Sequence, residues 1–596
     1  MIAHAAGIAQ PNPGSFEKRG YNRFLLLVAG LGGLLYGIDV GIIGGALPYL
    51  EATSHLNPSQ LSAIVAAVLL GSVFSTLFAG LLADWMGRKP LMILSGFAFT
   101  LSIPIIALAQ GYGPLFFGRL LQGMSAGFIG VVVPLYLAEC LSASSRGKGT
   151  GIFQWLLTAG IVAAALVGIF YSYRVAAVAQ TGDAAALFAF KDQAWRHIFW
   201  VSLPPGLVFV IGCFFVSESP RWLFRRGLRE RAESALLRSR SAEQTARELQ
   251  EMETTAHAAK RGQAIRDSLL RRKYVIPFLL TCLILCCNTA TGINSLIGYN
   301  TGILLQGGLS DLQAHWGYVI FTTTNFLMTI VGLTLVDRKG RKFLFVTGTT
   351  GIILSMATVG VLFLKTERQS VDCHPVLQAA VAPDQTLSLH FDQPEAARLL
   401  AGLKSAIDSQ RASLTVIYSY GDYTATTNFV RSDDPSAAPI QITRASCVPA
   451  NKVQSFFQNP FANLDAARTA PLVIRKALIG QVPNAGHGWL VALAIYLFVA
   501  CYAMGPGVCV WVALSELMPT RIRSNGMSIA LVLNQLVSTL LAGIFLPFVS
   551  KHGYSSMFFL FASFTVIYLL AAAFLLPETK GKTLEEIEAY FEGQSA

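Results

Sequence analysis

Long apolar runs alternate with short polar segments along most of this chain, and they predict helices that cross a membrane. A helix needs about 20 mostly apolar residues to span the hydrocarbon core of a bilayer. Nine runs of that length precede a polar stretch at 365–487, and three follow it. The predicted spans lie at 22–48, 60–82, 90–110, 113–138, 150–171, 198–216, 275–304, 315–336, 342–364, 488–514, 525–549 and 555–576.

Lysine and arginine gather in alternate connections between these spans. Arg88 and Lys89 lie between spans two and three and four basic residues occupy 338–342, whereas 51–59 and 305–314 contain none. Because basic connections stay on the cytoplasmic side, we expect both termini in the cytoplasm of a multi-pass protein in the plasma membrane, a bacterial inner membrane. The formal net charge of +12 then reflects topology, and we expect a lipid bilayer as the surroundings and no nucleic-acid partner.

The composition excludes an ordinary soluble enzyme. Hydrophobic residues make up 53% of the chain and charged residues 13%, whereas soluble domains carry about 25% charged residues. The sequence contains no recognisable nucleophile–base pair, cluster of metal ligands or phosphate-binding loop. We therefore expect no enzymatic activity, no cofactor and no metal.

An internal duplication divides the chain into two halves. Asp84-Trp-Met-Gly-Arg-Lys89 recurs 253 residues later as Asp337-Arg-Lys-Gly-Arg-Lys342, and Glu139 recurs 377 residues later as Glu516. The difference between the two offsets matches the length of the polar stretch, so the stretch is an insert in the second half. We predict an all-α membrane protein of two six-helix halves, an architecture typical of transporters. Its parts are an N-terminal half (1–217), a cytoplasmic linker with short helices (218–273), three helices (274–364), an extracytoplasmic insert (365–487), three helices (488–576) and a cytoplasmic tail (577–596).

The insert has the pattern of a small α+β domain. Residues 394–407 have helical spacing, and apolar residues alternate along 414–420 before Gly421-Asp422, as in a β-hairpin. Cys373 and Cys447 bracket most of the insert and could form a disulfide in an oxidising compartment. Two free thiols are an equally open alternative.

Two charged residues lie inside predicted spans, Asp39 in the first and Arg119 in the fourth. Ionisable groups within a membrane are costly and by default functional. We favour a role in coupling proton movement to transport over a fixed structural ion pair.

Further pairs of acid and arginine lie where spans meet the cytoplasm. Such pairs can lock neighbouring helices through charge-assisted bonds, and they form an inner gate if the bonds exist in one facing state only. A passive role in setting the topology is the alternative for the basic members. The candidate gate residues are Asp84, Arg88, Glu139, Arg146, Asp337, Arg341, Glu516 and Arg523.

Uncharged polar residues inside the spans suit a neutral cargo with many hydroxyl groups. Amides donate and accept hydrogen bonds together, as hydroxyl groups do, although a single amide can equally join two helices. The candidates are Gln154, Asn288, Thr289, Asn294, Asn325, Asn534 and Gln535, with Trp511 as a stacking surface.

These residues and their surroundings resemble the sugar porter family of the major facilitator superfamily, over nearly all of the chain outside 365–487. The motifs that carry the resemblance are Gly33 to Leu50, the repeated acidic–Gly–Arg connections, Pro134 to Glu139 with Arg146-Gly147, Trp195-Arg196, Glu218 to Leu223 and Pro577 to Gly581. The resemblance implies a sugar site midway between the halves, formed by Gln154, Asn294, Asn325 and Trp511, and a proton-coupling pair of Asp39 and Arg119. The chain departs from the family pattern at Asn288-Thr289, Gly298, Ser524 and Gln535, which changes the expected pocket.

We therefore expect a monomeric secondary transporter that moves a sugar or polyol by alternating access in symport with protons. A facilitative uniporter or a porter of another polar solute is one alternative. A sugar sensor whose outer domain binds a partner is another.

Overall fold

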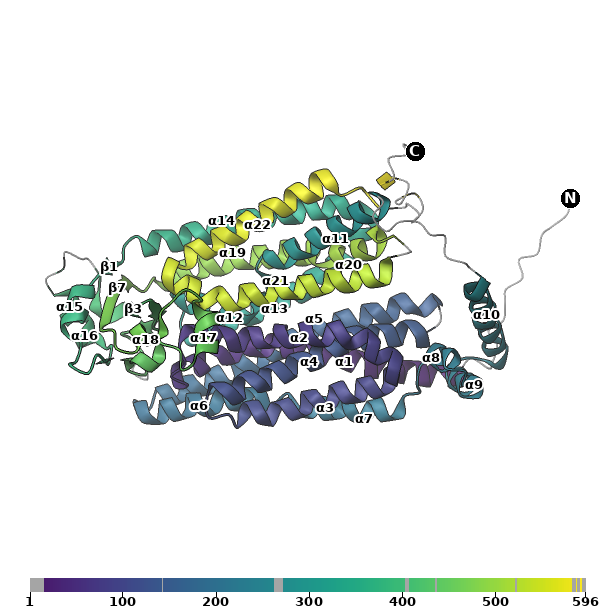
Figure 1. Cartoon of the computed structure of the whole chain (residues 1–596), viewed down its shortest axis with the longest axis horizontal. Helices are drawn as coiled ribbons and strands as arrows, with labels where there is room; N and C mark the ends of the chain where they lie inside the picture. The colour runs from purple at the N-terminus through teal and green to yellow at the C-terminus, as the bar shows by residue number, and fades with distance from the viewer. Residues whose placement is uncertain are drawn as a thin grey trace.

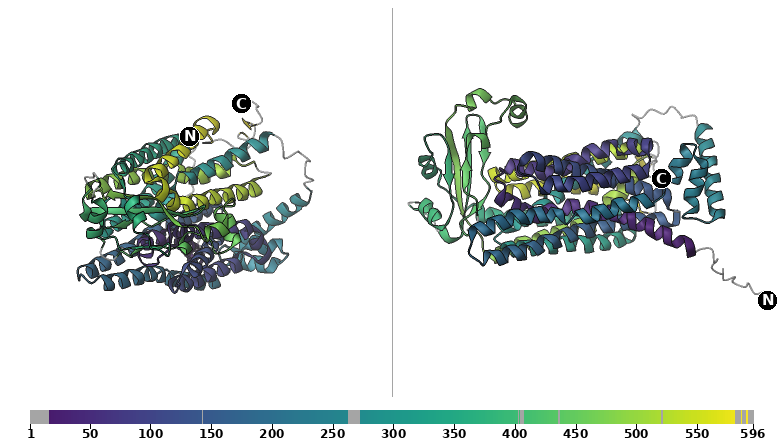
Figure 2. Two further views of the ribbon diagram at one scale, coloured as in Figure 1. Left: turned by 60° about the vertical axis from the view of Figure 1, so that its left-hand side comes forward. Right: turned by 90° about the horizontal axis from the view of Figure 1, so that it is seen from below.

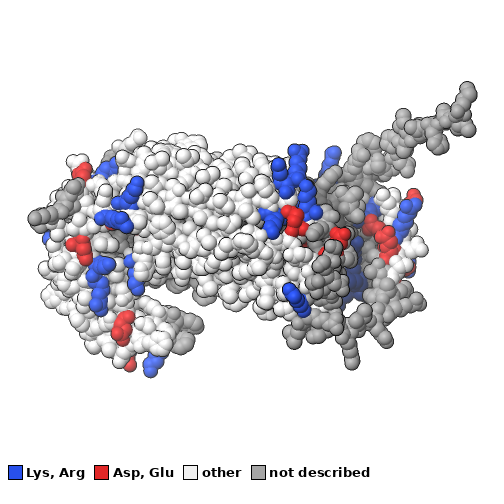
Figure 3. Space-filling model, turned by 90° about the horizontal axis from the view of Figure 1, so that it is seen from above, with Lys and Arg blue, Asp and Glu red and all other residues white. Residues whose placement is uncertain are grey.

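The computed structural model describes residues 16–141, 143–261, 272–401, 403, 407–434, 437–519, 522–580, 586 and 590–591. Twelve helices among them are long and apolar enough to cross a membrane, which confirms the predicted spans. They form two bundles side by side, with a mixed domain across one end (Figures 1 and 2). We name this the insert end, and the opposite end, where α1 begins, the linker end. Charged side chains lie near both ends and leave an uncharged band between them (Figure 3).

The N-terminal half holds six spans. Its sixth span begins at Ala184, fourteen residues before the predicted start, and bends at Val201-Ser202, where Pro204 and Pro205 in the next turn lack the amide that would continue the helix. The helices are α1 (Phe16–Thr53), α2 (Pro58–Met86), α3 (Arg88–Ala107), α4 (Tyr112–Cys140), α5 (Ala143–Ala179), α6 (Ala184–Trp200) and α7 (Leu203–Phe215).

The C-terminal half repeats this arrangement with two interrupted spans. The first is broken at Thr291-Gly292, where Gly292 has a φ of +89°, and the fourth is broken at Gly505. The helices are α11 (Arg272–Ala290), α12 (Ile293–Gln306), α13 (Asp311–Lys339), α14 (Arg341–Glu367), α19 (Ala485–Met504), α20 (Pro506–Leu517), α21 (Arg523–His552) and α22 (Tyr554–Leu570), which continues as η4 (Ala571–Leu575).

The duplication seen in the sequence is visible in how equivalent helices begin. At the insert end, α2 starts with a capping box in which the Asn57 side chain accepts from the Gln60 amide and the Gln60 side chain accepts from the Asn57 amide. Ser310 and Gln313 form the same box at the start of α13. Each box satisfies two backbone amides that the first helical turn leaves unpaired.

The same two helices end in equivalent glycine turns at the linker end. Gly87 and Gly340 belong to the repeated motif and have φ values of +102° and +90°, which favour glycine. A Cβ atom at Gly87 would collide with the Glu218 carboxylate, and one at Gly340 with the Glu578 carboxylate. The repeated glycines therefore admit a glutamate at the same place in each half.

Three short helices follow the N-terminal half at the linker end, where the sequence predicted amphipathic helices. They are α8 (Pro220–Arg225), α9 (Arg229–Leu237) and α10 (Ala242–Arg261). Buried Arg240 ties this segment to the bundle by donating to the Cys140 carbonyl at 2.7 Å.

The insert is built on an antiparallel sheet in the order β1-β7-β3-β4, with β5 also paired to β3. Tyr420 pairs with Tyr423 across Gly421-Asp422, so the hairpin lies where the alternation placed it. A second sheet pairs β2 with β6. The elements are β1 (Val371–Asp372), α15 (His374–Ala379), β2 (Leu387–Leu389), α16 (Gln393–Leu400), η2 (Ser409–Arg411), β3 (Ala412–Tyr420), β4 (Tyr423–Thr426), β5 (Val430–Arg431), β6 (Ile440–Ile442), η3 (Arg444–Ser446), α17 (Lys452–Gln458), α18 (Leu464–Ala467) and β7 (Leu472–Gln481).

One helix of the insert is shorter than expected, because the helix expected over 394–407 ends at Leu400. Cys373 and Cys447 are free thiols in this structure, which is one of the two alternatives that the sequence left open. The Cys373 thiol contacts the Ala477 carbonyl and the Cys447 thiol the Tyr423 carbonyl, which belong to different parts of the sheet. Burial raises the pKa of each thiol to about 11.

Candidate functional site

The two halves are joined by hydrogen bonds at the insert end. These bonds join α1, α2 and α5 to α12, α13 and α21, and among the described residues no hydrogen bond or ion pair joins the halves at the linker end. The structure is therefore closed at the insert end. The bonds include Tyr318 Oη to Gly41 O (2.7 Å), Thr301 Oγ1 to Gly44 O (2.6 Å), Tyr49 Oη to Asp311 Oδ2 (2.9 Å), Ser172 Oγ to Asp311 Oδ2 (2.6 Å) and Tyr299 Oη to Ser62 Oγ (3.1 Å).

Three candidate cargo residues flank the break between α11 and α12. The Asn288 side-chain amide donates to the Tyr502 hydroxyl at 3.1 Å, and its buried Oδ1 has no hydrogen-bond partner in the described part of the chain. Asn294 donates to the Ser538 hydroxyl at 2.6 Å. The Thr289 hydroxyl contacts backbone carbonyls of α11 and that of Asn534, so it serves packing between helices.

Three further candidates, Gln154, Asn325 and Trp511, lie on α5, α13 and α20. The side-chain amides of Gln154 and Asn325 form no hydrogen bond with any residue that the structure describes. Trp511 lies two turns beyond the break at Gly505 and leaves 48% of its surface exposed. These side chains can offer hydrogen bonds and an aromatic face to a bound molecule without losing partners of their own.

Asp39 and Arg119 meet in the interior of the N-terminal half. Asp39 Oδ1 lies 3.6 Å from Arg119 Nη1, and the two residues are 0% and 1% exposed. Neither carboxylate oxygen of Asp39 accepts a hydrogen bond from a described residue, whereas Arg119 Nη1 donates to Gln122 Oε1 at 2.6 Å. A buried carboxylate without hydrogen bonds is costly, so the geometry suits a group that changes its protonation.

A network of charges stabilises the linker end of the N-terminal half. Arg88 is 2% exposed, and its Nε lies 2.8 Å from Glu139 while its Nη2 lies 3.0 Å from Asp84. Glu139 also contacts Arg225 at 3.1 Å. Glu218 accepts the backbone amide of Arg88 at 3.0 Å. Burial raises the pKa of Glu218 above its ordinary value, although backbone amides that donate to it oppose the rise.

The C-terminal half contains the counterpart of this network. Arg341 Nη2 lies 2.9 Å from Glu516, and Thr579 donates to the same carboxylate at 2.5 Å. Glu578 accepts the backbone amides of Arg341 and Lys342, each at 3.1 Å. Each network joins helices within its own half.

Part of the predicted gate falls outside the residues whose side chains are described, namely Arg146, Asp337 and Arg523. Five residues outside the predicted gate complete the two networks: Ser219, which donates to Glu139, together with Glu218, Arg225, Glu578 and Thr579. A signal for four of them was present, because Glu218-Ser219 and Glu578-Thr579 each follow the last span of a half.

Curated relatives match almost the whole chain. This chain is 26% identical over 572 residues to the "Glucose transporter GlcP" of Staphylococcus epidermidis. The aligned region covers 95% of this chain and 97% of the relative. The chain is 26% identical over 598 residues to the human "Proton myo-inositol cotransporter" (97% and 84% covered) and 24% identical over 569 residues to the "Galactose-proton symporter" of Escherichia coli (95% and 93%).

Solved structures show the same fold. The partially occluded inward-open form of the xylose transporter XylE from Escherichia coli superposes with a TM-score of 0.62 at 19% identity, covering 95% of this chain and 100% of that one. Its inward-open form gives 0.62 at 21% identity, with 95% and 98% covered. The family described as "Sugar (and other) transporter" matches residues 25–380 and 470–591. The chain has twelve spans in two halves, with two interrupted spans in the C-terminal half, and it belongs to that family of membrane transporters.

Proposed function

We propose that this transporter moves a sugar or a polyol across the plasma membrane by alternating access, as a monomer, in symport with protons. The observation that carries the proposal is the set of amides and the tryptophan at the two helix breaks. Asn288 Oδ1 has no partner among the described residues, and Trp511 is half exposed. Interrupted helices near the middle of a membrane are where transporters bind their cargo. The names of the relatives, which include glucose, galactose and myo-inositol, support the class of cargo.

In this proposal the linker end faces the cytoplasm, because the repeated basic connections lie there and basic connections stay inside. The hydrogen bonds between the halves then close the outer side, and the structure represents an inward-facing state. The networks of Arg88 and Arg341 act as parts of the inner gate that rearrange when the halves approach each other at that side.

Asp39 and Arg119 are the proposed proton-coupling pair. Protonation of Asp39 removes a buried charge that accepts no hydrogen bond from the described residues, so the protonated and ionised forms stabilise different arrangements of the half around it. A facilitator would use the same pair as a fixed ion pair, and the 3.6 Å separation is compatible with it.

Transport by the purified protein in liposomes tests the proposal. We would measure uptake of labelled glucose, galactose, xylose and myo-inositol with and without an inward proton gradient. Accumulation above equilibrium that requires the gradient supports symport, and equilibration without accumulation supports a facilitator. Absence of flux for the whole panel would contradict the proposed cargo and favour another polar solute or a sensor.

A further inference from the structure

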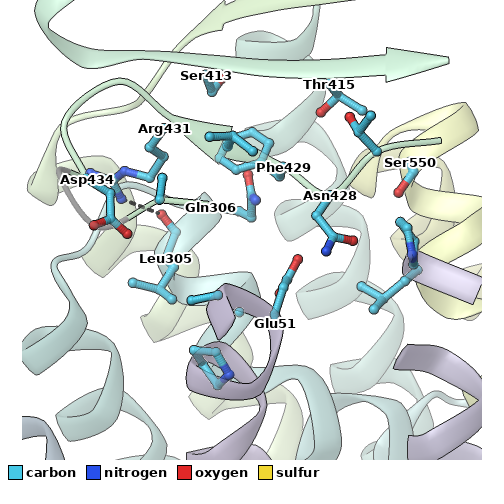
Figure 4. A pocket seen from close by; sticks show the side chains of 18 of the residues that line it. Glu51, Leu305, Gln306, Ser413, Thr415, Asn428, Phe429, Arg431, Asp434 and Ser550 are labelled. Carbon is cyan, nitrogen blue, oxygen red and sulfur yellow. Dashed lines mark hydrogen bonds between the residues drawn. The ribbon is translucent and has the colours of Figure 1, made fainter. Parts of the chain in front are cut away.

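A cavity of about 1040 Å³ lies between the insert and the insert end of both halves. We name it the outer chamber. Binding sites for small molecules have volumes of roughly 300–1000 Å³, so the chamber has room for a sugar-sized molecule and its water. Its lining joins the last turns of α1 and α12 and the start of α22 to β3, β7 and the segment 426–441 of the insert (Figure 4).

Glu51, in the last turn of α1, supplies a carboxylate to the floor of the chamber. In Figure 4 its side chain is directed into the cavity, toward the segment that carries Asn428. Glu51 is partly buried and has neither a hydrogen bond nor an ion pair with any residue that the structure describes. A carboxyl group accepts hydrogen bonds in both protonation states, and the bonds to its ionised form are the stronger ones. Glu51 therefore offers unused acceptors inside a cavity.

Two basic residues in the wall of the chamber form ion pairs with acidic residues of the insert, at 433–434. Arg431 forms an ion pair with Asp433 at 2.7 Å, and Lys191 of α6 one with Asp434 at 3.1 Å. Arg431 also donates to the Leu305 carbonyl at 3.4 Å, the bond drawn in Figure 4. The positive charges of this part of the wall are balanced by the two aspartates. This part of the wall therefore does not favour an anionic ligand.

Many of the other lining residues are neutral polar groups or aromatic rings, beside the acidic residues Asp311 and Glu367. Asn428 donates to the Leu56 carbonyl at 2.8 Å, while its Oδ1 has no partner among the described residues. Lys476 and Lys551 also belong to the lining, and both side chains are exposed to solvent. Amides, hydroxyls and ring faces together match a ligand with many hydroxyl groups and apolar C–H faces. Neutral lining groups of this kind include Gln306, Thr427, Gln441, Tyr418, Phe429 and Tyr554.

We propose that the outer chamber is a second binding site, separate from the site between the halves, for a neutral solute with many hydroxyl groups, with Glu51 as its principal acceptor. The proposal rests on the proposed function for the class of solute. Because the halves are closed below the chamber in this state, a molecule bound there is separated from the site between the halves by the bonds of Gly41 and Gly44. The protein can then hold a second solute molecule outside while the first is released inside.

Equilibrium dialysis on the purified full-length protein in lipid nanodiscs tests this site. The probes are radiolabelled glucose, galactose, xylose and myo-inositol, and the measured quantity is the number of molecules bound per chain. We expect two for the transported sugar. In the double variant Asn288→Ala/Trp511→Ala, which weakens the site between the halves, we expect one. Adding Glu51→Gln should weaken that remaining binding by about tenfold, because the variant changes the principal acceptor of the chamber.

Glu233→Gln is the matched control, because Glu233 is exposed on α9, far from the chamber in sequence and at the opposite end of the molecule. It should leave both binding events unchanged. One bound molecule in the wild type, or a Glu51→Gln isotherm that matches the control, would overturn the inference. If the wild type transports a sugar yet binds one molecule, the second site alone is refuted. If it neither transports nor binds any probe, the proposed function fails with it.

Discussion

Asn288 and Tyr502 link the two interrupted spans of the C-terminal half: the Asn288 amide donates to the Tyr502 hydroxyl at 3.1 Å. Asn288 lies four residues before Gly292, and Tyr502 three residues before Gly505. The bond therefore holds the two breaks in a fixed relation while Asn288 Oδ1 remains available.

We predict that Asn288→Ala raises the sugar concentration for half-maximal uptake by a factor of about two to ten, because it removes a cargo acceptor, and hydrogen bonds are worth about 0.5–1.5 kcal/mol each. Tyr502→Phe serves as the comparison, since it removes the partner and leaves the Asn288 amide in place. It should raise that concentration by less than Asn288→Ala does. Equal effects from the two variants would show that cargo binding depends on the hydrogen bond between Asn288 and Tyr502 and not on the Oδ1 atom of Asn288.

Asp39→Asn should abolish accumulation driven by a proton gradient and preserve exchange of labelled for unlabelled sugar. Asparagine keeps the shape of the side chain and cannot carry a proton between states. The measurement is uptake and counterflow in the same liposomes, with Glu233→Gln as the control. Gradient-driven accumulation that survives in Asp39→Asn would assign coupling to another group.

Arg88→Gln should destabilise the protein more than Arg341→Gln. The Arg88 side chain is 2% exposed and faces a Glu139 side chain that is 9% exposed, whereas the Arg341 side chain is 13% exposed and faces a Glu516 side chain that is 23% exposed. Removing one partner of a buried ion pair costs about 3–5 kcal/mol, and contact with solvent lowers that cost. Thermal unfolding of the two purified variants checks this order, and a reversed order would contradict it.

The polar contacts between the insert and the N-terminal half should favour the state closed at the insert end. Lys191 pairs with Asp434, and the Asn57 amide donates to the Ser446 carbonyl at 3.3 Å. The double variant Lys191→Gln/Asn57→Ala removes these two contacts and leaves the bond from Asn428 to the Leu56 carbonyl, so the population open at the insert end should rise. Distances between spin labels on α2 and α13 at that end measure the shift.

Lys365→Gln is the control for this double variant, because Lys365 is exposed on α14 and lacks an ion pair in the described part of the chain. It should leave the distance distribution unchanged. A double variant with the distribution of the wild type would show that the insert does not influence the equilibrium.

Cys373 and Cys447 should resist alkylation in the native protein at pH 8. Burial raises the pKa of each thiol to about 11, so the reactive thiolate is a minor form at pH 8 and its fraction rises as the pH approaches 11. After denaturation without reductant, mass spectrometry should find both residues alkylated. Alkylation that requires a reductant would instead indicate a disulfide.

The twelve spans followed from the sequence because membrane helices must be long and apolar, and the duplicated motif fixed the equivalence of Arg88 and Arg341. Contacts between residues far apart in the sequence could not be predicted. Glu218 reaches Arg88 over 130 residues, and no local pattern specifies that contact. The early start of span six at Ala184 was also missed, because the first turns of that helix are less apolar than its membrane part.

The residue types of the candidate cargo site could be predicted from the sequence, but their contacts could not. Asn288, Asn294 and Trp511 were identified as polar or aromatic residues in spans, but the sequence does not say which of their atoms remain without partners. The role of Thr289 in helix packing depends on the position of Asn534 in another span. The outer chamber could not be predicted from the sequence, because it depends on where the insert lies relative to Glu51 and its neighbours.

Three-residue connections attach the insert to the C-terminal half, one between α14 and β1 and one, 482–484, between β7 and α19. The second is itself tied down, since the Val482 amide donates to the Arg411 carbonyl and Arg411 donates to the Pro483 carbonyl. In the proposed transport cycle the insert therefore follows the C-terminal half, and a small rotation of that half gives a larger displacement at the far side of the insert. A fluorophore on its exposed face, at Phe461 for example, would report each turn of the cycle from outside the membrane.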